Sequence, residues 1–291
     1  MIEPPAFYAA VGLNVETYDA RTERDLVGTS VEGDLGFYLD RARQIGGPVL
    51  DLGGGTGRIA WALAGEGHEV TLLDLSVGMI TMAEAKRAMQ PAEVSRRLRT
   101  VQADMTDFQL DQTFALVIAA FRAFMAVLTA AGQRHCLESV ARHLQPGGVL
   151  LLDLFDPRLD LLLQTEPFAP KLDPVRHPVS GNDVRIKTVW RKPDPMTQTF
   201  EELWRFTEIE PDGTVVRTED EILTMRWTYR AEMRYLLELT GFTVDAEYGD
   251  FHGSPPVYGR EQVWVARKLS GRRRSTHMRP RRLRAGGASH P

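Results

Sequence analysis

One short stretch, residues 49–60 with the sequence VLDLGGGTGRIA, constrains the fold more than any other part of the chain. Its apolar start, residues 49–52, is typical of a buried parallel strand. Glycines follow at positions 53, 55 and 57, and an amphipathic helical pattern opens at Arg58. A strand, a glycine turn and a helix in this order form the ligand-binding corner of a doubly wound α/β fold. We therefore expect this stretch to begin such a fold and to contact its ligand.

The spacing of the glycines bears on the kind of ligand. A dinucleotide fingerprint, G-x-G-x-x-G/A, ends on Arg58 when it is counted from Gly53, and arginine is too large for that close contact between helix and strand. Counted from Gly55, the same pattern ends on Ala60, so a nicotinamide dinucleotide stays open. A nucleoside-triphosphate loop needs a terminal G-K-[ST], which this stretch lacks.

The pattern D-x-G-x-G-x-G, from Asp51 to Gly57, resembles the first motif of the class I S-adenosylmethionine-dependent methyltransferases. Glycines let the backbone approach a ligand closely, and the helix start near Gly57 offers free N–H groups to the methionine carboxylate. The resemblance implies an α/β fold with a doubly wound, mostly parallel seven-stranded sheet, and S-adenosyl-L-methionine as the cofactor. It implies cofactor contacts at Asp51, Gly53, Gly55, Gly57 and Arg58.

The end of the next predicted strand carries a second set of expected contacts. Residues 68–74, HEVTLLD, predict a second buried strand that ends at Asp74, whose carboxylate is placed to accept hydrogen bonds from both hydroxyls of a ribose. This role suits an adenosyl group or a nicotinamide dinucleotide equally. By resemblance to the family, Leu75 and Met79 contribute apolar contacts to the adenine.

The third and fourth predicted strands add contacts at the same edge of the sheet. Asp104 follows the strand predicted at 98–102 and resembles the family's acceptor of the adenine amine, with the Met105 backbone N–H meeting a ring nitrogen. Residues 114–120 predict the fourth strand, and ligands bind at the carboxyl ends of such strands. The residues expected to face the reacting methyl group are Ala120, Phe121 and Arg122.

The order of predicted elements divides the chain into parts. We expect the S-adenosylmethionine-binding core over 47–156 and 228–268, with the last strand antiparallel as in the family. Alternation with period two predicts an antiparallel β insertion over 178–227, on the substrate side. An N-terminal helical lid is expected over 1–46. Residues 271–291 hold seven arginines and no acid, which predicts a basic disordered tail.

Composition sets the broad class of the protein. The 291 residues are 43% apolar and 25% charged, as in soluble globular proteins. The sequence has no apolar run of membrane-spanning length and no signal-peptide pattern at its start, so we expect a cytoplasmic protein without a membrane partner. Cys136 fits a core position on a helix. The net charge of −4, with seven arginines in the tail, leaves an acidic body, and we expect no nucleic-acid partner.

The acceptor site is marked less clearly than the cofactor site. The sulfonium of the cofactor activates the methyl group, so the protein must place an acceptor in line and a catalytic residue can be absent. The weak candidates for catalysis are His252, a possible base near neutral pH, Arg122 and Tyr248. We expect an acceptor pocket between the N-terminal segment, the end of the fourth strand and the insertion, lined also by Trp190 and Arg226.

The motifs narrow the substrate class. Amino-methyltransferases of nucleic-acid bases carry N/D-P-P-Y/F/W after the fourth strand, where residues 119–124 here read AAFRAF. No H-x-x-x-H or C-x-x-C spacing occurs, so no metal site is predicted. We therefore predict in-line transfer of a methyl group to a nitrogen or oxygen of a small-molecule substrate. A nicotinamide-dependent oxidoreductase and a non-catalytic S-adenosylmethionine-binding protein remain alternatives.

Overall fold

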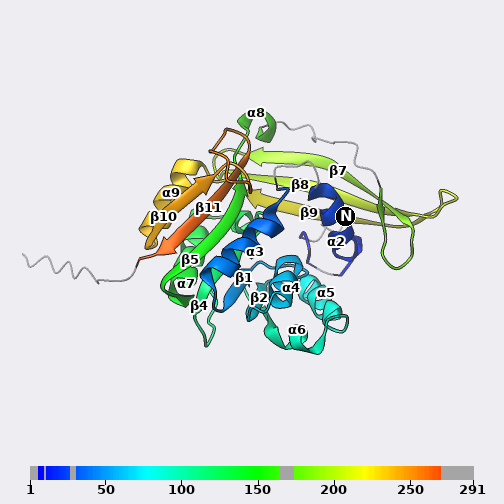
Figure 1. Ribbon diagram of the computed structural model, residues 1–291. Coiled ribbons are helices and arrows are strands. Elements are labelled where there is room, and N and C mark those ends of the chain that lie inside the picture. Colours follow the sequence, from blue (N-terminus) through cyan, green and yellow to red (C-terminus); the bar gives the residue numbers. More distant parts are fainter. Residues whose placement is uncertain (1–5, 10, 27–30, 164–173, 270–291) are drawn as a thin grey trace, which may run out of the picture.

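A seven-stranded sheet forms the centre of the computed structural model, which describes residues 6–9, 11–26, 31–163 and 174–269. Its strand order is β10-β11-β5-β4-β1-β2-β3 (Figure 1). The five strands from β5 to β3 pair in parallel, whereas β11 is antiparallel to both β5 and β10. The predicted doubly wound, mostly parallel sheet is confirmed. Its strands are β1 (Val49–Leu52), β2 (Val70–Asp74), β3 (Leu98–Gln102), β4 (Phe114–Ala119), β5 (Leu144–Phe155), β10 (Phe242–Tyr248) and β11 (Glu261–Lys268).

Helices cover both faces of this sheet because its strands are buried on both sides. Leu50 and Leu52 of β1 pack into the apolar layer that includes α7 and α9, and Val49 packs into the opposite layer with α3 and α4. Cys136 is buried in the α7 layer, as predicted, and burial raises the pKa of its thiol. The helices are α3 (Asp34–Ile45), α4 (Arg58–Gly65), α5 (Val77–Arg87), α6 (Ala92–Arg97), α7 (Ala130–His143) and α9 (Arg230–Leu239).

The predicted insertion forms a separate antiparallel sheet of order β6-β7-β8-β9. Asp212 accepts a hydrogen bond from the Thr214 backbone N–H at 2.8 Å, and Gly213 has φ +93°, which closes the turn between β8 and β9. The sheet starts at β6, before the predicted position 178. Its strands are β6 (Val175–Arg176), β7 (Asp183–Asp194), β8 (Thr199–Ile209) and β9 (Val215–Arg226).

The N-terminal segment joins the two sheets. The short helix α1 (Leu13–Glu16) contacts both β8 and α5, and α2 (Tyr18–Leu26) follows it directly (Figure 1). The Phe7 N–H donates to the Ile222 carbonyl at 2.9 Å, so residues 6–8 run alongside β9. Two further short helices, η1 (Ala123–Ala126) and α8 (Leu159–Leu162), follow β4 and β5. The cavity described below lies where these parts meet.

Some local features of the structure were not expected from the sequence, and some expected features lie outside the described residues. The helix α6 was not predicted, since its six residues carry a single buried apolar side chain, Val94. The strand β5 begins at Leu144, and residues 145–148 with their two glycines lie inside it, where its pairing with β4 shifts register. The predicted tail at 271–291 lies outside the described residues, as does part of the predicted lid.

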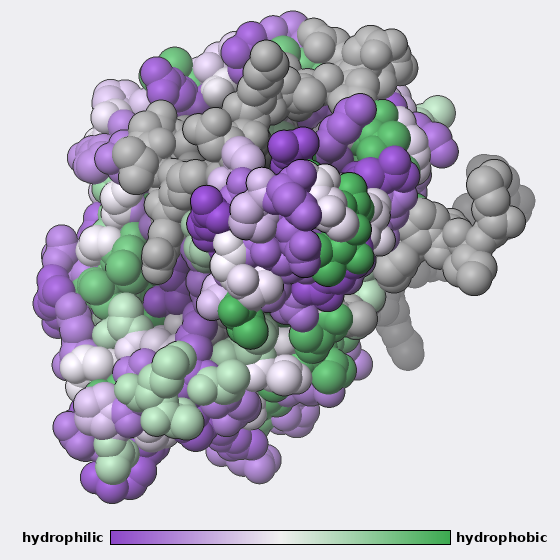
Figure 2. Space-filling view, turned by 90° about the vertical axis from the view of Figure 1, so that its right-hand side faces the viewer, coloured by the Kyte–Doolittle hydropathy of each residue, from purple (hydrophilic) through white to green (hydrophobic). Residues whose placement is uncertain are grey.

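Hydrophilic and hydrophobic side chains are interspersed on the face that Figure 2 shows. Within the described ranges, no helix has the length and apolar character that crossing a bilayer requires. The same ranges contain no cluster of three or more side chains suited to hold a metal ion.

Candidate functional site

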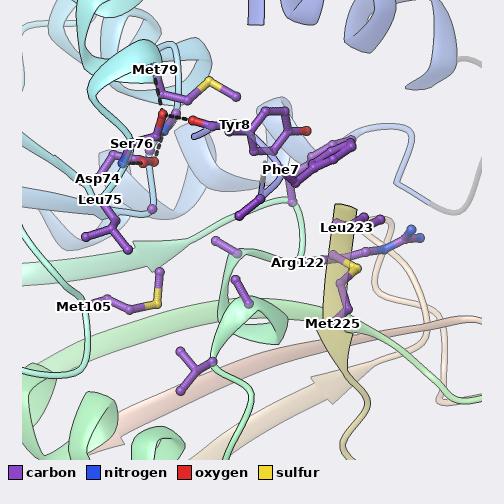
Figure 3. A pocket seen from close by; sticks show the side chains of 18 of the residues that line it. Phe7, Tyr8, Asp74, Leu75, Ser76, Met79, Met105, Arg122, Leu223 and Met225 are labelled. Carbon is purple, nitrogen blue, oxygen red and sulfur yellow. Dashed lines mark hydrogen bonds between the residues drawn. The ribbon is translucent and has the colours of Figure 1, made fainter. Parts of the chain in front are cut away.

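A cavity of about 1030 Å³ opens at the carboxyl ends of β1, β2 and β4, between the central sheet and the insertion. Asp74, Leu75 and Met105 lie on one side of it, and Leu223 and Met225 of β9 lie on the other (Figure 3). Ligands of doubly wound folds bind at this edge of the sheet. The volume is at the upper end of the roughly 300–1,000 Å³ typical of ligand pockets, so two molecules can be held together.

The glycine corner after β1 shapes the near wall of the cavity. Gly53 has φ +70°, and a Cβ there would lie 2.7 Å from the Cβ of Ala123, so only glycine fits. Gly53 and Gly55 line the cavity, whereas Gly57 does not. Gly57 precedes α4 with φ +80°, and a Cβ there would lie 2.9 Å from the ring of Trp61. Close packing at the start of α4 therefore explains why residue 57 is a glycine.

The buried carboxyl group of Asp51 lines the cavity. It is 1% exposed, and neither carboxylate oxygen has a hydrogen-bond partner within the described ranges. Burial raises the pKa of Asp51 to about 7, against the opposing effect of the Arg58 guanidinium. A buried carboxylate of this kind needs a donor or a cation, and the methionine ammonium of S-adenosylmethionine is such a group. The residues present fit the predicted cofactor.

Arg58 also lines the cavity, but its charge is already paired. Its Nη1 donates to Asp34 Oδ1 at 2.9 Å, and Nη2 donates to the other oxygen of the same buried carboxylate. The guanidinium lies over the ring of Phe121, 5.8 Å from its centroid. Arg58 thus ties α4 to α3 and presents its stem to the cavity.

The turn after β2 is organised by Asp74. The carboxylate accepts hydrogen bonds from the backbone N–H groups of Gly55 and Ser76, both at 2.8 Å (Figure 3). Burial raises the pKa of this carboxyl group, and these N–H donors act against the rise. The side chain of Leu75 is 64% exposed beside the cavity, as an apolar contact for a ligand would be, whereas Met79 is buried at the cavity wall.

Asp104 and Met105 reach the same cavity from the turn after β3. Asp104 is exposed, and its Oδ1 accepts from both the N–H and the hydroxyl of Thr106 at 2.8 Å. The Oδ2 oxygen makes no hydrogen bond to a described residue. The structure therefore brings Asp74 and Asp104 to one cavity, as the sequence predicts.

The turn after β4 holds two residues in a left-handed conformation. Phe121 has φ +54° and Arg122 has φ +64°, which is strained for residues with a side chain. The buried Asp153 of β5 fixes this turn, since its two oxygens accept from the backbone N–H groups of Phe121 at 2.8 Å and Arg122 at 2.9 Å. The Tyr38 hydroxyl donates to the same carboxylate at 2.5 Å.

The environment of Asp153 sets the electrostatics of this turn. Burial and the nearby Glu261 raise the pKa of Asp153 to about 7, and the Tyr38 hydroxyl opposes the rise. Ala120, Phe121 and Arg122, which were expected to face the reacting methyl group, line the cavity. The guanidinium of Arg122 pairs with buried Glu261. Arg122 is thus a cavity residue whose charge is already satisfied by the fold.

The far wall comes from the N-terminal segment and β9, which sequence reasoning identified only as regions. The Tyr8 N–H donates to Glu221 at 2.9 Å, and the Tyr8 carbonyl accepts from the Ser76 hydroxyl at 2.5 Å (Figure 3). Tyr8 therefore spans from the insertion to the turn after β2. Further lining residues that were not predicted individually are Phe7, Tyr18, Arg21, Trp204, Leu223 and Met225.

Four residues proposed for the acceptor pocket lie elsewhere. His252 is exposed in the loop between β10 and β11, against Gly33, and Tyr248 packs on Phe37 and accepts a hydrogen bond from Arg41. Trp190 lies under the ammonium of Lys192, 4.3 Å from the ring centroid. Arg226 is buried and bonded to Gln133 and Glu232. None of these four residues lines the cavity.

The comparisons with known proteins agree with this arrangement. A family model described as a methyltransferase domain matches residues 49–148. The cypemycin N-terminal methyltransferase of a Streptomyces species is 30% identical over 234 residues, which cover 79% of this chain and 88% of that protein. The chain belongs to the class I S-adenosylmethionine-dependent methyltransferases. S-Adenosylmethionine is therefore its cofactor, which resolves the choice that the glycine spacing left open.

Two other similar proteins act on different acceptors. The glycopeptide N-methyltransferase MtfA, solved in complex with S-adenosyl-L-methionine, aligns with a TM-score of 0.51 at 25% identity, covering 84% of this chain and 96% of that one. The tRNA 5-carboxymethoxyuridine methyltransferase of Escherichia coli (strain K12) is 36% identical over 154 residues, covering 49% of this chain and 56% of that protein.

Proposed function

We propose that the protein transfers a methyl group from S-adenosylmethionine to a nitrogen atom of a small-molecule acceptor. The observation that supports this most is the single cavity, which is continuous from the glycine corner to a wall of aromatic and apolar side chains. One end offers carboxylates and backbone groups, and the other offers Phe7, Tyr8 and Trp204. A cofactor at the first end leaves room for an acceptor at the second.

At the first end, we assign the cofactor contacts as the family pattern suggests. Asp74 accepts the ribose hydroxyls, Asp104 accepts the adenine amine, and Leu75 packs against the base. Asp51 receives the positive charge of the methionine ammonium, which its unpartnered oxygens require. When bound there, S-adenosylmethionine supplies a methyl group activated by its sulfonium.

At the second end, the chain positions the acceptor and excludes water. The ionisable side chains that line this half are Tyr8, Tyr18, Arg21 and Arg122. Burial raises the pKa of both phenols, so they stay protonated at neutral pH and do not serve as bases. They can donate or accept a hydrogen bond and so orient the attacking atom.

This set of side chains favours nitrogen over oxygen as the acceptor. A neutral amine attacks through its lone pair and loses its extra proton afterwards, whereas an alcohol needs a base during the attack. The low polarity of the aromatic wall also disfavours a charged ammonium, which keeps the amine in its reactive form. The name of MtfA specifies a nitrogen acceptor as well, and the name of the cypemycin relative specifies an N-terminus.

A transfer assay tests the proposal. The purified full chain is incubated with methyl-labelled S-adenosylmethionine and a panel of small primary and secondary amines, their alcohol counterparts, and total tRNA. We expect label in amine products, identified by mass spectrometry as N-methyl derivatives, and markedly less label after Asp74→Ala at the same subsaturating cofactor concentration. Label confined to the alcohols or to tRNA would contradict the proposed acceptor.

A further inference from the structure

Three arginines line the cavity, and they differ in whether a carboxylate pairs with the guanidinium charge. Arg58 pairs with Asp34, and Arg122 pairs with Glu261. Arg21 of α2 is 6% exposed, yet among the described residues it has no ion-pair partner. A buried charge is ordinarily paired, because desolvation without a counter-charge costs several kcal/mol. Arg21 is therefore the cavity arginine that makes no direct hydrogen bond to a carboxylate within the described ranges.

The surroundings of Arg21 hold its guanidinium in one place without neutralising it. Its carbon Cζ lies 5.7 Å from the ring centroid of Tyr18, 5.9 Å from that of Trp204 and 5.7 Å from that of Phe206. Rings at this range attract a cation and restrict the planar group. Three aromatic contacts from α2 and β8 thus preorganise the side chain.

Both hydrogen bonds of the Arg21 guanidinium are donated by the same nitrogen, Nη2. Nη2 donates to Asn14 Oδ1 at 2.9 Å and makes a long 3.5 Å contact with the Tyr8 hydroxyl. Within the described ranges, Nε and Nη1 have no hydrogen-bond partner. Since the residue lines the cavity, these donors are left for a group inside it.

The buried carboxylate of Glu221 attracts Arg21, but its hydrogen bonds go to other groups. Glu221 of β9 accepts from the Tyr8 N–H at 2.9 Å and from Asn14 Nδ2 at 2.6 Å. Glu221 attracts Arg21 electrostatically, and the amide of Asn14 bridges the two, since it donates to Glu221 and accepts from Arg21. The amide fixes both neighbours, and the positive charge remains directed at the cavity.

We propose that Arg21 binds an anionic oxygen group of the acceptor, so that the methyl acceptor is an amine that also carries a carboxylate or a phosphoryl group. The planar fork of arginine matches either oxyanion. The carboxylates that line the cavity, Asp51, Asp74 and Asp104, lie at the cofactor end, so they leave the region of Arg21 open to a negative charge. This inference rests on the proposed small-molecule acceptor and names its chemical class.

A binding measurement separates this inference from the methyl-transfer proposal. The full chain is saturated with S-adenosylhomocysteine, and benzoate, phenylphosphonate and uncharged benzamide are titrated into it by calorimetry. We expect at least one anion to bind about tenfold or more tightly than benzamide, as charge-assisted hydrogen bonds provide. Tighter binding of benzoate identifies a carboxylate as the natural group, and tighter binding of phenylphosphonate identifies a phosphoryl group.

Matched variants show whether Arg21 is the cause. Arg21→Gln should abolish the preference for the anion, and Arg205→Gln should keep it, because Arg205 pairs with Asp220 on the exposed side of the insertion. Arg21→Lys keeps the charge but loses the fork, so we expect it to bind the preferred anion about threefold or more weakly than wild type. Unchanged affinity for S-adenosylhomocysteine shows that each variant is folded.

Two results would overturn the proposal. One is a wild-type protein that binds neither anion better than benzamide, and the other is a preference for the anion that survives Arg21→Gln. Neither result depends on turnover. Failure of the amine panel in the transfer assay would refute the proposed acceptor atom, while an Arg21-dependent preference for benzoate would still establish an oxyanion site.

Discussion

Replacing Asp51 by asparagine should stabilise the unliganded protein and weaken its hold on the cofactor. The carboxylate is 1% exposed without a hydrogen-bond partner among the described residues, and burial raises its pKa from 3.8 to about 7. A shift of about 3 units corresponds to about 4 kcal/mol of destabilisation when the group is ionised. Asparagine removes that charge, although its buried amide retains part of the desolvation cost.

The sign of the pH dependence follows from the raised pKa. Between about pH 4 and pH 7 the folded protein binds more protons at Asp51 than the unfolded chain does, so stability falls as the pH rises through this range. The penalty is fully present above pH 7. Urea denaturation of unliganded protein should therefore show Asp51→Asn more stable than wild type by about 1–3 kcal/mol at pH 8, and by less at pH 5.

Cofactor binding should show the opposite effect. If the methionine ammonium requires the ionised carboxylate, the affinity of wild type for S-adenosylmethionine rises about eightfold from pH 6 to pH 7.5 for a pKa of about 7. Asp51→Asn should bind more weakly and lose most of this dependence in calorimetric titrations. A variant that is less stable than wild type at pH 8, or that binds with unchanged affinity and pH profile, would refute the reasoning.

Three further substitutions test other parts of the site. Asp74→Ala should weaken S-adenosylmethionine binding by about 1–3 kcal/mol in calorimetry, because hydrogen bonds to a charged acceptor are lost; a folded variant with unchanged affinity would rule out the ribose contact. Leu75→Ala should lower cofactor affinity by about 1 kcal/mol while changing urea stability by less than about 0.5 kcal/mol, since the side chain is 64% exposed before binding. Tyr38→Phe should reduce the free energy of unfolding by about 1–2 kcal/mol, because the hydrogen bond to Asp153 is lost. The loss should be larger at pH 8.5 than at pH 6, since the pKa of Asp153 is raised to about 7 and its carboxylate accepts this hydrogen bond most strongly when ionised. Equal losses at the two pH values would contradict that last assignment.

The cofactor end could be predicted from sequence because its residues are tied to strand ends. Residues that end parallel strands meet at one edge of a sheet, whatever the length of the connections. Asp74 closes β2 and Asp104 follows β3, so recognising the strands was enough to bring them together. The glycine turn after β1 could also be predicted, because the close packing around position 53 leaves no room for a side chain.

The acceptor end could not be predicted residue by residue, because it depends on how distant segments dock. Tyr8 and Glu221 are 213 positions apart, and nothing in local periodicity specifies their hydrogen bond. Alternation along β9 indicates which residues share a face but not which face meets the core. The cavity is in fact lined by the four consecutive residues 222–225, so Leu223 and Met225 were missed, whereas Arg226, which was expected in the pocket, binds Gln133 instead.

The histidine candidate was wrong for a related reason. A histidine in a loop after a core strand suggests a base from its titration range alone. The loop between β10 and β11 carries His252 to the exposed surface beside Gly33, and it does not line the cavity. The chemistry of the imidazole suggested a role as a base, whereas the position of β10 at the edge of the sheet keeps His252 away from the cavity.

The most direct measurement of the central claim is a crystal structure of the full chain with S-adenosylhomocysteine bound. The account predicts the ribose hydroxyls on the carboxylate of Asp74, the adenine between Leu75 and Met105 with its amine on Asp104, and the amino group of the ligand at Asp51. The sulfur should face open space bounded by Phe121, Tyr8 and Trp204. A ligand bound outside this cavity, or one that leaves both strand-end carboxylates without contact, would contradict the account.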